Sequence, residues 1–241
     1  MAQKITWIGH GSWKLTTSQG IKIYVDPFIK GNPAAAIKLE DAYDADIIAV
    51  THGHSDHLGD TIDIMKNTDC DLVTLADIYA YLELHGIPND KNGGAVQQGG
   101  STIIKGVKFN CVPACHTSDI WGVEYAAEKK LMPGSGCCGF VITAPGDKPV
   151  YFSGDTGVFG DMKLIAELYQ PYVSVLPVCG KFTMGIKEAN MAARFLQSRF
   201  IIPGHYNTFP STQRTVEELM GIVEGLDSEL IILKPGESFE F

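Results

Sequence analysis

Short apolar runs separated by turn residues predict strands and helices along the whole chain. In the first third, alternating or apolar runs predict an antiparallel meander of strands at residues 4–9, 13–17 and 21–25. Two buried strands are expected at 46–50 and 72–75. Helical spacing predicts helices over 58–66 and 77–85, and Gly86 followed by Pro88 ends the second.

The middle of the chain is rich in strands, and the last third alternates helices with strands. Apolar runs predict strands at 101–104, 107–113, 139–143, 150–153, 172–177, 200–202 and 230–233. Helices are expected over 162–169, 188–197 and 215–225. No Pro/Ser-rich linker or change of composition divides the sequence, which predicts a single domain over residues 1–241. The order of elements favours an α/β (α+β) fold in which two mixed sheets are sandwiched between helices.

The most informative segment is a histidine cluster that directly follows the strand at 46–50. The sequence Thr-His-Gly-His-Ser-Asp-His at 51–57 places His52, His54, Asp56 and His57 within six positions. In an extended chain, residues i and i+2 point to the same side, so His52 and His54 can reach one ion. Asp56 and His57 can face a second ion nearby. Three of the seven histidines of the chain in so short a segment indicate a metal site rather than a solvated loop.

Three further candidate ligands each lie just past the end of a predicted strand. They are His116 after 107–113, Asp155 after 150–153 and His205 after 200–202. Strand ends are where sheets of this class build their sites. Imidazole combined with carboxylate suits zinc, iron or manganese better than calcium or magnesium.

Composition excludes several classes of protein. The 241 residues are 45% apolar, which is ample for a buried core, and no run approaches the ~18 apolar residues that a membrane span needs. With 28 acidic and 19 basic side chains, the net charge of −9 argues against nucleic-acid binding. The N-terminus has no signal-peptide pattern, so we expect a cytoplasmic protein with reduced cysteines and no membrane partner.

The motifs resemble one known family over nearly the whole chain. The segment 51–57 is similar to the His-x-His-x-Asp-His signature of the metallo-β-lactamase superfamily. Segments 5–10, 25–28, 154–157, 182–185 and 205–210 resemble a subgroup of uncharacterised metal-dependent hydrolases related to the ascorbate-6-phosphate lactonases. The resemblance implies a four-layer αββα sandwich. The sequence departs from the pattern at Cys137-Cys138, where the family has a small pair without cysteine, and at Cys179, where glycine is usual. We expect Cys137 and Cys138 to be two buried thiols.

The resemblance also implies a ligand set for two metal ions, most commonly zinc, with manganese or iron as alternatives. His52, His54 and His116 would hold one ion, Asp56, His57 and His205 the other, and Asp155 would bridge them. A hydroxide held between the two ions would attack the substrate. Asp56 is a candidate acceptor for its proton.

The residues expected around these ligands are less strongly indicated. Asp26 is a candidate for orienting an imidazole, or else a turn carboxylate. His10, between two glycines, is a candidate catalytic residue at the pocket mouth. Loops 29–38 and 120–136 are expected to set specificity. The remaining candidates border the implied site: Thr183, Met184, Asn207 and Thr208.

These features predict a dinuclear hydrolase of a small ester, lactone or phosphodiester. The alternatives are an iron-dependent oxidoreductase on the same scaffold and a ribonuclease or phosphodiesterase acting on RNA, which the acidic balance disfavours. A small molecule is the expected partner, and a homo-oligomer remains open.

Overall fold

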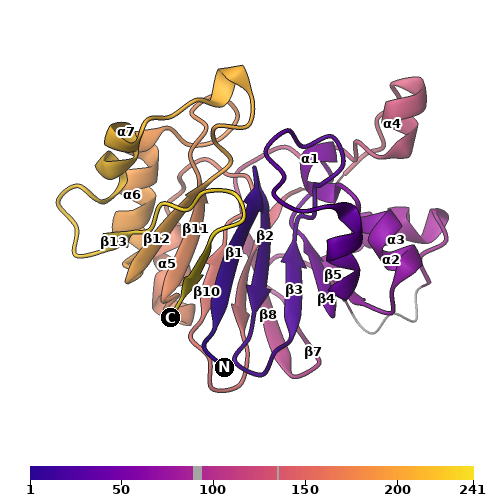
Figure 1. Cartoon of the computed structure of the whole chain (residues 1–241), viewed down its shortest axis with the longest axis horizontal. Coiled ribbons are helices and arrows are strands. Elements are labelled where there is room, and N and C mark those ends of the chain that lie inside the picture. The colour runs from indigo at the N-terminus through magenta and orange to yellow at the C-terminus, as the bar shows by residue number, and fades with distance from the viewer. Residues whose placement is uncertain (89–93, 135) are drawn as a thin grey trace.

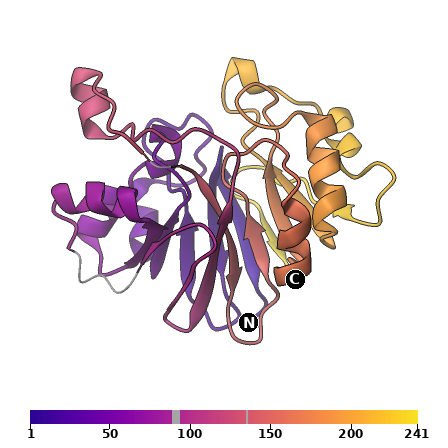
Figure 2. The same ribbon diagram turned by 180° about the vertical axis from the view of Figure 1, so that it is seen from behind.

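Fourteen strands form two sheets of seven in the part of the chain that the computed structural model describes, residues 1–88, 94–134 and 136–241. The sheets lie face to face, with helices outside both (Figures 1 and 2). The predicted αββα sandwich of two mixed sheets is therefore confirmed.

The first sheet combines an antiparallel meander with a parallel half. The strands run in the order β14 (Ser238–Glu240), β1 (Lys4–Gly9), β2 (Ser12–Thr16), β3 (Lys22–Val25), β4 (Ile47–Val50), β5 (Asp71–Leu75) and β6 (Ala95–Val96). Strands β14 to β3 pair antiparallel, and β3 to β6 pair parallel. The predicted meander is thus confirmed, and the switch of direction occurs at β3.

The second sheet repeats this plan. Its order is β13 (Glu229–Leu230), β12 (Phe200–Gly204), β11 (Val173–Pro177), β10 (Val150–Phe152), β9 (Cys138–Thr143), β8 (Val107–Pro113) and β7 (Ser101–Ile104). Strands β7 to β10 pair antiparallel, and β10 to β13 pair parallel. Both sheets therefore carry parallel strands whose carboxyl ends meet along one edge of the sandwich.

Helices cover the two outer faces. The first sheet carries α2 (Thr61–Asn67) and α3 (Ala76–Leu84), and the second carries α5 (Met162–Tyr169), α6 (Ile186–Leu196) and α7 (Val216–Met220) (Figure 1). The short helix α1 (Ser55–Leu58) lies at the site edge, and α4 (Val123–Glu128) stands away from the body of the molecule. Among the described residues, no helix is both long enough and apolar enough to span a membrane.

The core lies between the sheets and beneath the helices. Strands β4, β5, β10 and β11 are buried at every position, as expected for strands that are covered on both faces. Their largely apolar sequences are the pattern from which these strands were predicted. The largest fully buried side chains are Tyr24, Tyr151, Phe109, Phe140 and Phe152.

Several predicted boundaries are wrong. The helix expected over 58–66 begins only at Thr61, as α2, and residues 55–58, expected as loop apart from Leu58, form the separate short helix α1. The helix expected over 215–225 ends at Met220 and continues as the 3₁₀ turn Gly221–Val223, and the last predicted strand stops at Leu230. Segment 120–136, of which residue 135 lies outside the described residues, contains α4 rather than only loop. A 3₁₀ helix, Leu39–Asp44, and a second, Pro210–Thr212, were also not anticipated.

Candidate metal centre

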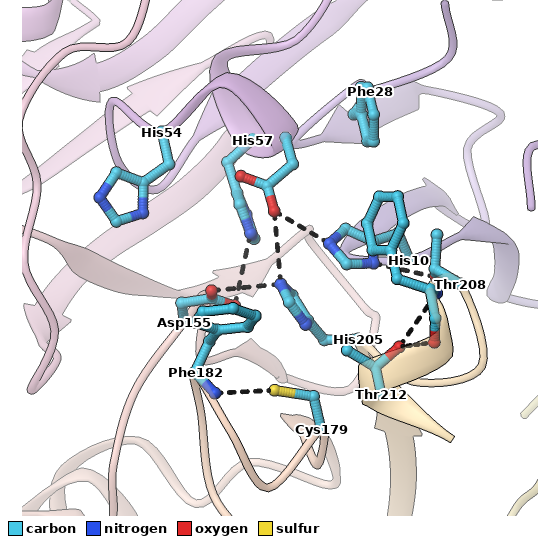
Figure 3. Close-up of polar contacts among 12 residues, drawn as sticks. His10, Phe28, His54, His57, Asp155, Cys179, Phe182, His205, Thr208 and Thr212 are labelled. Atoms are coloured by element: carbon cyan, nitrogen blue, oxygen red, sulfur yellow. Dashed lines mark hydrogen bonds and ion pairs between the residues drawn. The ribbon is translucent and has the colours of Figure 1, made fainter. Parts of the chain in front are cut away.

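Loops that follow six strands converge at one edge of the sandwich. Figure 3 shows His10, His57, Asp155 and His205 gathered there. Both sheets contribute, because the loop after β4 belongs to the first sheet and those after β8, β10 and β12 belong to the second. The titratable side chains that these loops supply are His10, Asp26, His52, His54, Asp56, His57, His116, Asp155 and His205. The sequence placed all of them at strand ends, and the fold brings those ends together.

His52, His54 and His116 form the first cluster, with one ring nitrogen of each within 4.8 Å of the others. His52 Nε2 lies 3.0 Å from His54 Nδ1. Thr51 Oγ1 donates its only hydrogen to Asp26 Oδ2 at 2.6 Å, so it accepts from His52 Nδ1 at 3.1 Å. The neutral ring of His52 therefore presents the Nε2 lone pair to the cluster.

Burial keeps this cluster in the form that binds metals. Burial lowers the pKa of His54 and of His116 below the ordinary value, and it lowers the pKa of the fully buried His52 well below that value. The neighbouring imidazoles add to the effect, because a charge on one ring disfavours a charge on the next. All three rings are thus neutral near pH 7, and neutral imidazole is the ligand form.

Asp56, His57, His205 and His10 form the second cluster, again within 4.8 Å of one another. Asp56 Oδ2 lies 3.0 Å from His10 Nε2 and 3.6 Å from His205 Nε2. The rings of His57 and His205 are parallel, with centroids 5.5 Å apart. This cluster differs from the first in holding a carboxylate.

Asp155 lies between the two clusters. Its Oδ1 is 3.4 Å from His57 Nε2, and its Oδ2 is 3.2 Å from His205 Nε2 and 3.6 Å from His116 Nε2. The carboxylate is almost completely buried. Burial alone would raise its pKa, but His205 and His57 hold that pKa well below the ordinary value.

The donor atoms at the centre lack ordinary hydrogen-bond partners. Among the described residues, His57 Nε2, His205 Nε2 and Asp155 Oδ1 are buried without a hydrogen bond. Burial opposes the protonation of His57, yet the carboxylates of Asp155 and Asp26 raise its pKa to about 10. Buried, unpartnered nitrogen and carboxylate atoms that favour positive charge fit divalent cations, because a cation would satisfy all of them at once.

Asp26 anchors both clusters from behind. Its Oδ1 accepts the backbone N–H of Thr51 at 2.7 Å, and its Oδ2 accepts the Thr51 hydroxyl at 2.6 Å. The same Oδ2 lies 2.8 Å from His57 Nδ1, so it fixes which nitrogen of His57 faces Asp155. Of the two interpretations of Asp26, orientation of an imidazole agrees with these contacts.

His10 is buried rather than at the pocket mouth. Its side chain is 1% exposed. Nε2 lies 3.0 Å from Asp56 Oδ2, and Nδ1 lies 2.9 Å from Thr208 Oγ1, another predicted site residue. Phe209, which covers the ring edge-on with centroids 5.4 Å apart, separates His10 further from solvent. His10 therefore contacts the Asp56 cluster from inside.

The other predicted pocket residues lie farther from the clusters. Thr183 binds Cys179, Met184 packs in the hydrophobic core, and Asn207 forms hydrogen bonds with the backbone of Arg214. In the sequence, Cys179 stands out only as a departure from the family pattern. Burial raises the pKa of its thiol, but the nearby His205 ring, the Thr183 hydroxyl and backbone N–H groups lower that pKa to about 6. All six cysteines are free thiols, as predicted.

Strained backbone marks the strand ends that carry the site. His10, Asp26 and His205 directly follow β1, β3 and β12, and their φ angles are 57°, 50° and 58°. Residues other than glycine rarely adopt this left-handed region, and such strain clusters at functional sites. Each turn aims its side chain into the site. Nothing in the apolar pattern reveals this geometry.

Known proteins share both the sequence pattern and the fold of this chain. A family model described as a beta-lactamase superfamily domain matches residues 4–205. A UPF0173 metal-dependent hydrolase of Methanosarcina barkeri is 42% identical over 238 residues, 98% of each chain. The chain belongs to this family. Igni18, a metallo hydrolase from the archaeon Ignicoccus hospitalis, has a solved structure that is 31% identical with a TM-score of 0.84, covering 100% of this chain and 99% of its own.

A more distant protein also has the same fold. The metallo-beta-lactamase fold protein YhfI of Bacillus subtilis superposes with a TM-score of 0.72 over 99% of both chains at 16% identity. That likeness shows the fold alone. The predicted superfamily is therefore confirmed, and within it the UPF0173 metal-dependent hydrolase family is the level that the comparisons establish.

Proposed function

We propose that the protein is a hydrolase that uses two divalent cations to cleave a small ester, lactone or phosphodiester. One observation carries the proposal. Side chains from both sheets, all of them common ligands of zinc, manganese and iron, converge with buried donor atoms that lack hydrogen-bond partners among the described residues. A purely structural polar cluster would satisfy these atoms internally.

The two clusters suggest how the ligands divide. His52, His54 and His116 would hold one cation, and Asp56, His57 and His205 the other. Asp155 approaches members of both clusters and would be shared. We assign zinc as the first choice, with manganese or iron as alternatives.

The bound cations would lower the pKa of water towards neutrality and polarise the substrate oxygen. The protein's own groups prepare the site for this chemistry. Asp26 holds the proton on His57 Nδ1, and Thr51 accepts the proton on His52 Nδ1, so the opposite nitrogens face inward. His10 contacts Asp56 through Oδ2, so the other oxygen, Oδ1, is free of that contact. We propose Asp56 Oδ1 as the acceptor of the proton released from water.

Lactones are among the proposed substrates because of the resemblance to the ascorbate-6-phosphate lactonases. The relationship to that subgroup stays a prediction. So do the cytoplasmic location, the absence of a nucleic-acid partner and the oligomeric state. The oxidoreductase and ribonuclease alternatives have no observation in the site that favours them.

Elemental analysis of protein purified without chelators tests the proposal. We expect two zinc or manganese ions per chain, lost together in Asp155→Ala. Asp71→Asn is the matched control, because Asp71 is also a buried carboxylate but pairs with Lys105 away from the site. A screen of esters, lactones and phosphodiesters should then show turnover that Asp155→Ala abolishes.

Other outcomes would contradict the proposal in distinct ways. Predominantly iron, together with oxidation rather than hydrolysis, would favour the oxidoreductase alternative. A chain that binds no metal after reconstitution would exclude the mechanism. If two ions bind but none of these substrate classes is hydrolysed, the metal site would be supported and the proposed reaction would be contradicted.

A further inference from the structure

A groove of about 410 Å³ opens between α1 and α4, beside the first histidine cluster. Figure 1 shows α4 projecting next to α1 at the site edge of the molecule. The volume is within the range of small-molecule sites. The apolar part of its lining comes from α1, α2, α4 and the loop before α4, and consists of Leu58, Ile62, Trp121, Val123, Tyr125 and Ala126.

The lining favours an uncharged, apolar occupant. Among the described residues that line the groove, Lys129 alone carries a formal charge. Its Nζ lies 5.1 Å from the ring centroid of Tyr125, so an aromatic face already holds the ammonium group. By contrast, the larger cavity of about 1060 Å³ at the opposite edge is lined by Lys163, Glu167, Arg194 and other charged side chains.

Trp121 connects the groove to the histidine cluster. Its indole centroid is 5.3 Å from that of His54 and 4.6 Å from that of Tyr125. The backbone N–H of Trp121 donates to Gly53 O at 2.8 Å. A Cβ on Gly53 would lie 2.9 Å from Ile120 Cα, so only glycine permits this close approach. The inner end of the groove is therefore fixed beside His54.

Polar contacts, rather than core packing, position the outer wall. Helix α4 has no buried residue, and Val123 is 49% exposed. The N-terminal end of α4 is held by Tyr81, whose hydroxyl accepts from Val123 N at 3.0 Å and donates to Glu124 at 2.8 Å. His85 Nε2, 3.0 Å from Glu124, adds a second contact from the end of α3. The apolar side chains on this wall are left available for a ligand.

We propose that this groove, the α1–α4 groove, binds an unbranched apolar acyl chain of the substrate and presents its carbonyl to the histidine clusters. The inference rests on the proposed function and narrows its substrate class to esters or lactones of apolar acids. Each buried methylene contributes ~0.8 kcal/mol, so binding should tighten about fourfold per added carbon. The effect should stop once the chain reaches the end of the groove.

Binding of straight-chain amides, followed by Trp121 fluorescence, tests the groove without requiring turnover. Trp7 and Trp13 are 2% exposed and stack on each other, so Trp121 is the tryptophan that a ligand can reach. We expect hexanamide and octanamide to bind successively more tightly than acetamide and to change the emission. Trp121→Phe should remove the signal but not the binding measured by calorimetry.

Two groove variants and one control separate the alternatives. Val123→Asp places a charge in the groove and should lower the affinity for octanamide at least tenfold. Ala126→Trp, which fills the groove, should lower that affinity by a similar factor. Leu168→Asp is the control, because Leu168 is an exposed apolar residue on α5, outside the groove. Circular dichroism checks that each variant is folded.

The results distinguish this proposal from the proposed function. Equal affinity for acetamide and octanamide, or octanamide binding that both groove variants leave unchanged, would overturn the groove assignment. Self-association that Val123→Asp abolishes, without amide binding, would make the groove an interface between two copies and would also overturn it. Tight amide binding without hydrolysis of the matching 4-nitrophenyl esters would support the groove while contradicting the hydrolase reaction.

Discussion

At the residue scale, Thr208 and His10 together hold Asp56 in position. A carboxylate only accepts hydrogen bonds, so His10 Nε2 must donate across the 3.0 Å to Asp56 Oδ2. Thr208 Oγ1, 2.9 Å from His10 Nδ1, fixes the other side of the ring. We therefore expect His10 to act through Asp56 rather than on substrate.

Thr208→Val should therefore weaken binding of the metal ion held by the Asp56 cluster and leave the ion of the His52 cluster in place. Loss of a hydrogen bond to a ligand itself typically costs 10–100-fold in metal affinity, and Thr208 lies one residue further out, so we expect a loss towards the lower end, about tenfold. Chelator competition with metal analysis measures the effect, and we expect about one ion per chain to be lost first. Thr208→Ser, which keeps the hydroxyl, should restore wild-type affinity. Unchanged affinity in the valine variant would show that His10 does not position Asp56.

The site residues could be predicted where local backbone geometry determines their positions. Contacts between residues far apart in the sequence could not. His52 and His54 were predictable, because extended backbone alternates its side chains, and the two rings do lie 4.6 Å apart. The contact of His10 with Asp56 and Thr208 joins segments 46 and 198 residues apart. No local pattern encodes such a meeting. The position of Cys179 beside His205 was hidden for the same reason.

At the element scale, Gly59 explains why the predicted helix 58–66 does not begin at Leu58. Its φ of +48° and ψ of −129° end α1, and a Cβ there would lie 2.3 Å from Pro27 O. Leu58 fits the apolar spacing of α2, so hydrophobic spacing alone begins that helix before Gly59. The steric contact with Pro27 comes from a loop more than thirty residues earlier.

Gly59→Ala should destabilise the protein far more than a matched glycine substitution. Gly86, which follows α3, has a φ of +82°, but no atom lies within 4 Å of the position that a Cβ would occupy there. Gly86→Ala should cost about 1–2 kcal/mol, the ordinary penalty for a left-handed alanine. Gly59→Ala adds a backbone clash and should cost clearly more. Urea denaturation compares the two, and equal losses would mean that the Pro27 contact relaxes freely.

The carboxylate of Asp44 connects the 3₁₀ helix Leu39–Asp44 to the first sheet. It accepts hydrogen bonds from Lys14, Lys22 and Tyr24 at 2.7 to 2.9 Å. Burial raises the pKa of Asp44, but these hydrogen bonds outweigh burial and lower it below the ordinary value. The charged form is therefore the stabilising one. The sequence did not predict this 3₁₀ helix, since its anchors are side-chain contacts rather than periodicity.

Asp44→Asn should reduce stability at pH 7 by about 1 kcal/mol, the upper range for a partly exposed pair. Because the folded pKa is lowered, the contribution of Asp44 is present above the unfolded pKa and disappears as pH falls through the folded value. The difference between wild type and variant should shrink steadily below about pH 4. Urea denaturation at pH 7 and at about pH 2.5 checks this. A difference that grows towards acid pH would contradict the sign of the shift.

At the scale of the whole molecule, the site ties the two sheets together. The loop after β4 in the first sheet supplies His52 to His57, whereas His116, Asp155 and His205 follow strands of the second sheet. The sequence predicted this sandwich, because its strands and helices occur in an order that few architectures accommodate. It could not predict the register of one sheet against the other, which decides which loops meet.

Metal removal should therefore lower the stability of the entire domain, not only its activity. The chain has a net charge of −9, and the carboxylates of Asp26, Asp56 and Asp155 are concentrated at the centre. Cations at 100 times their dissociation constant would each stabilise the folded state by about 2.7 kcal/mol. For a chain of this size, removal of both cations should lower Tm by roughly 10–20 °C. The Asp155→Ala variant should already have a low Tm, and chelator should not lower it further, because both ions would share that carboxylate. An equal chelator-induced shift in wild type and variant would mean that the cations stabilise the protein somewhere other than between its two sheets.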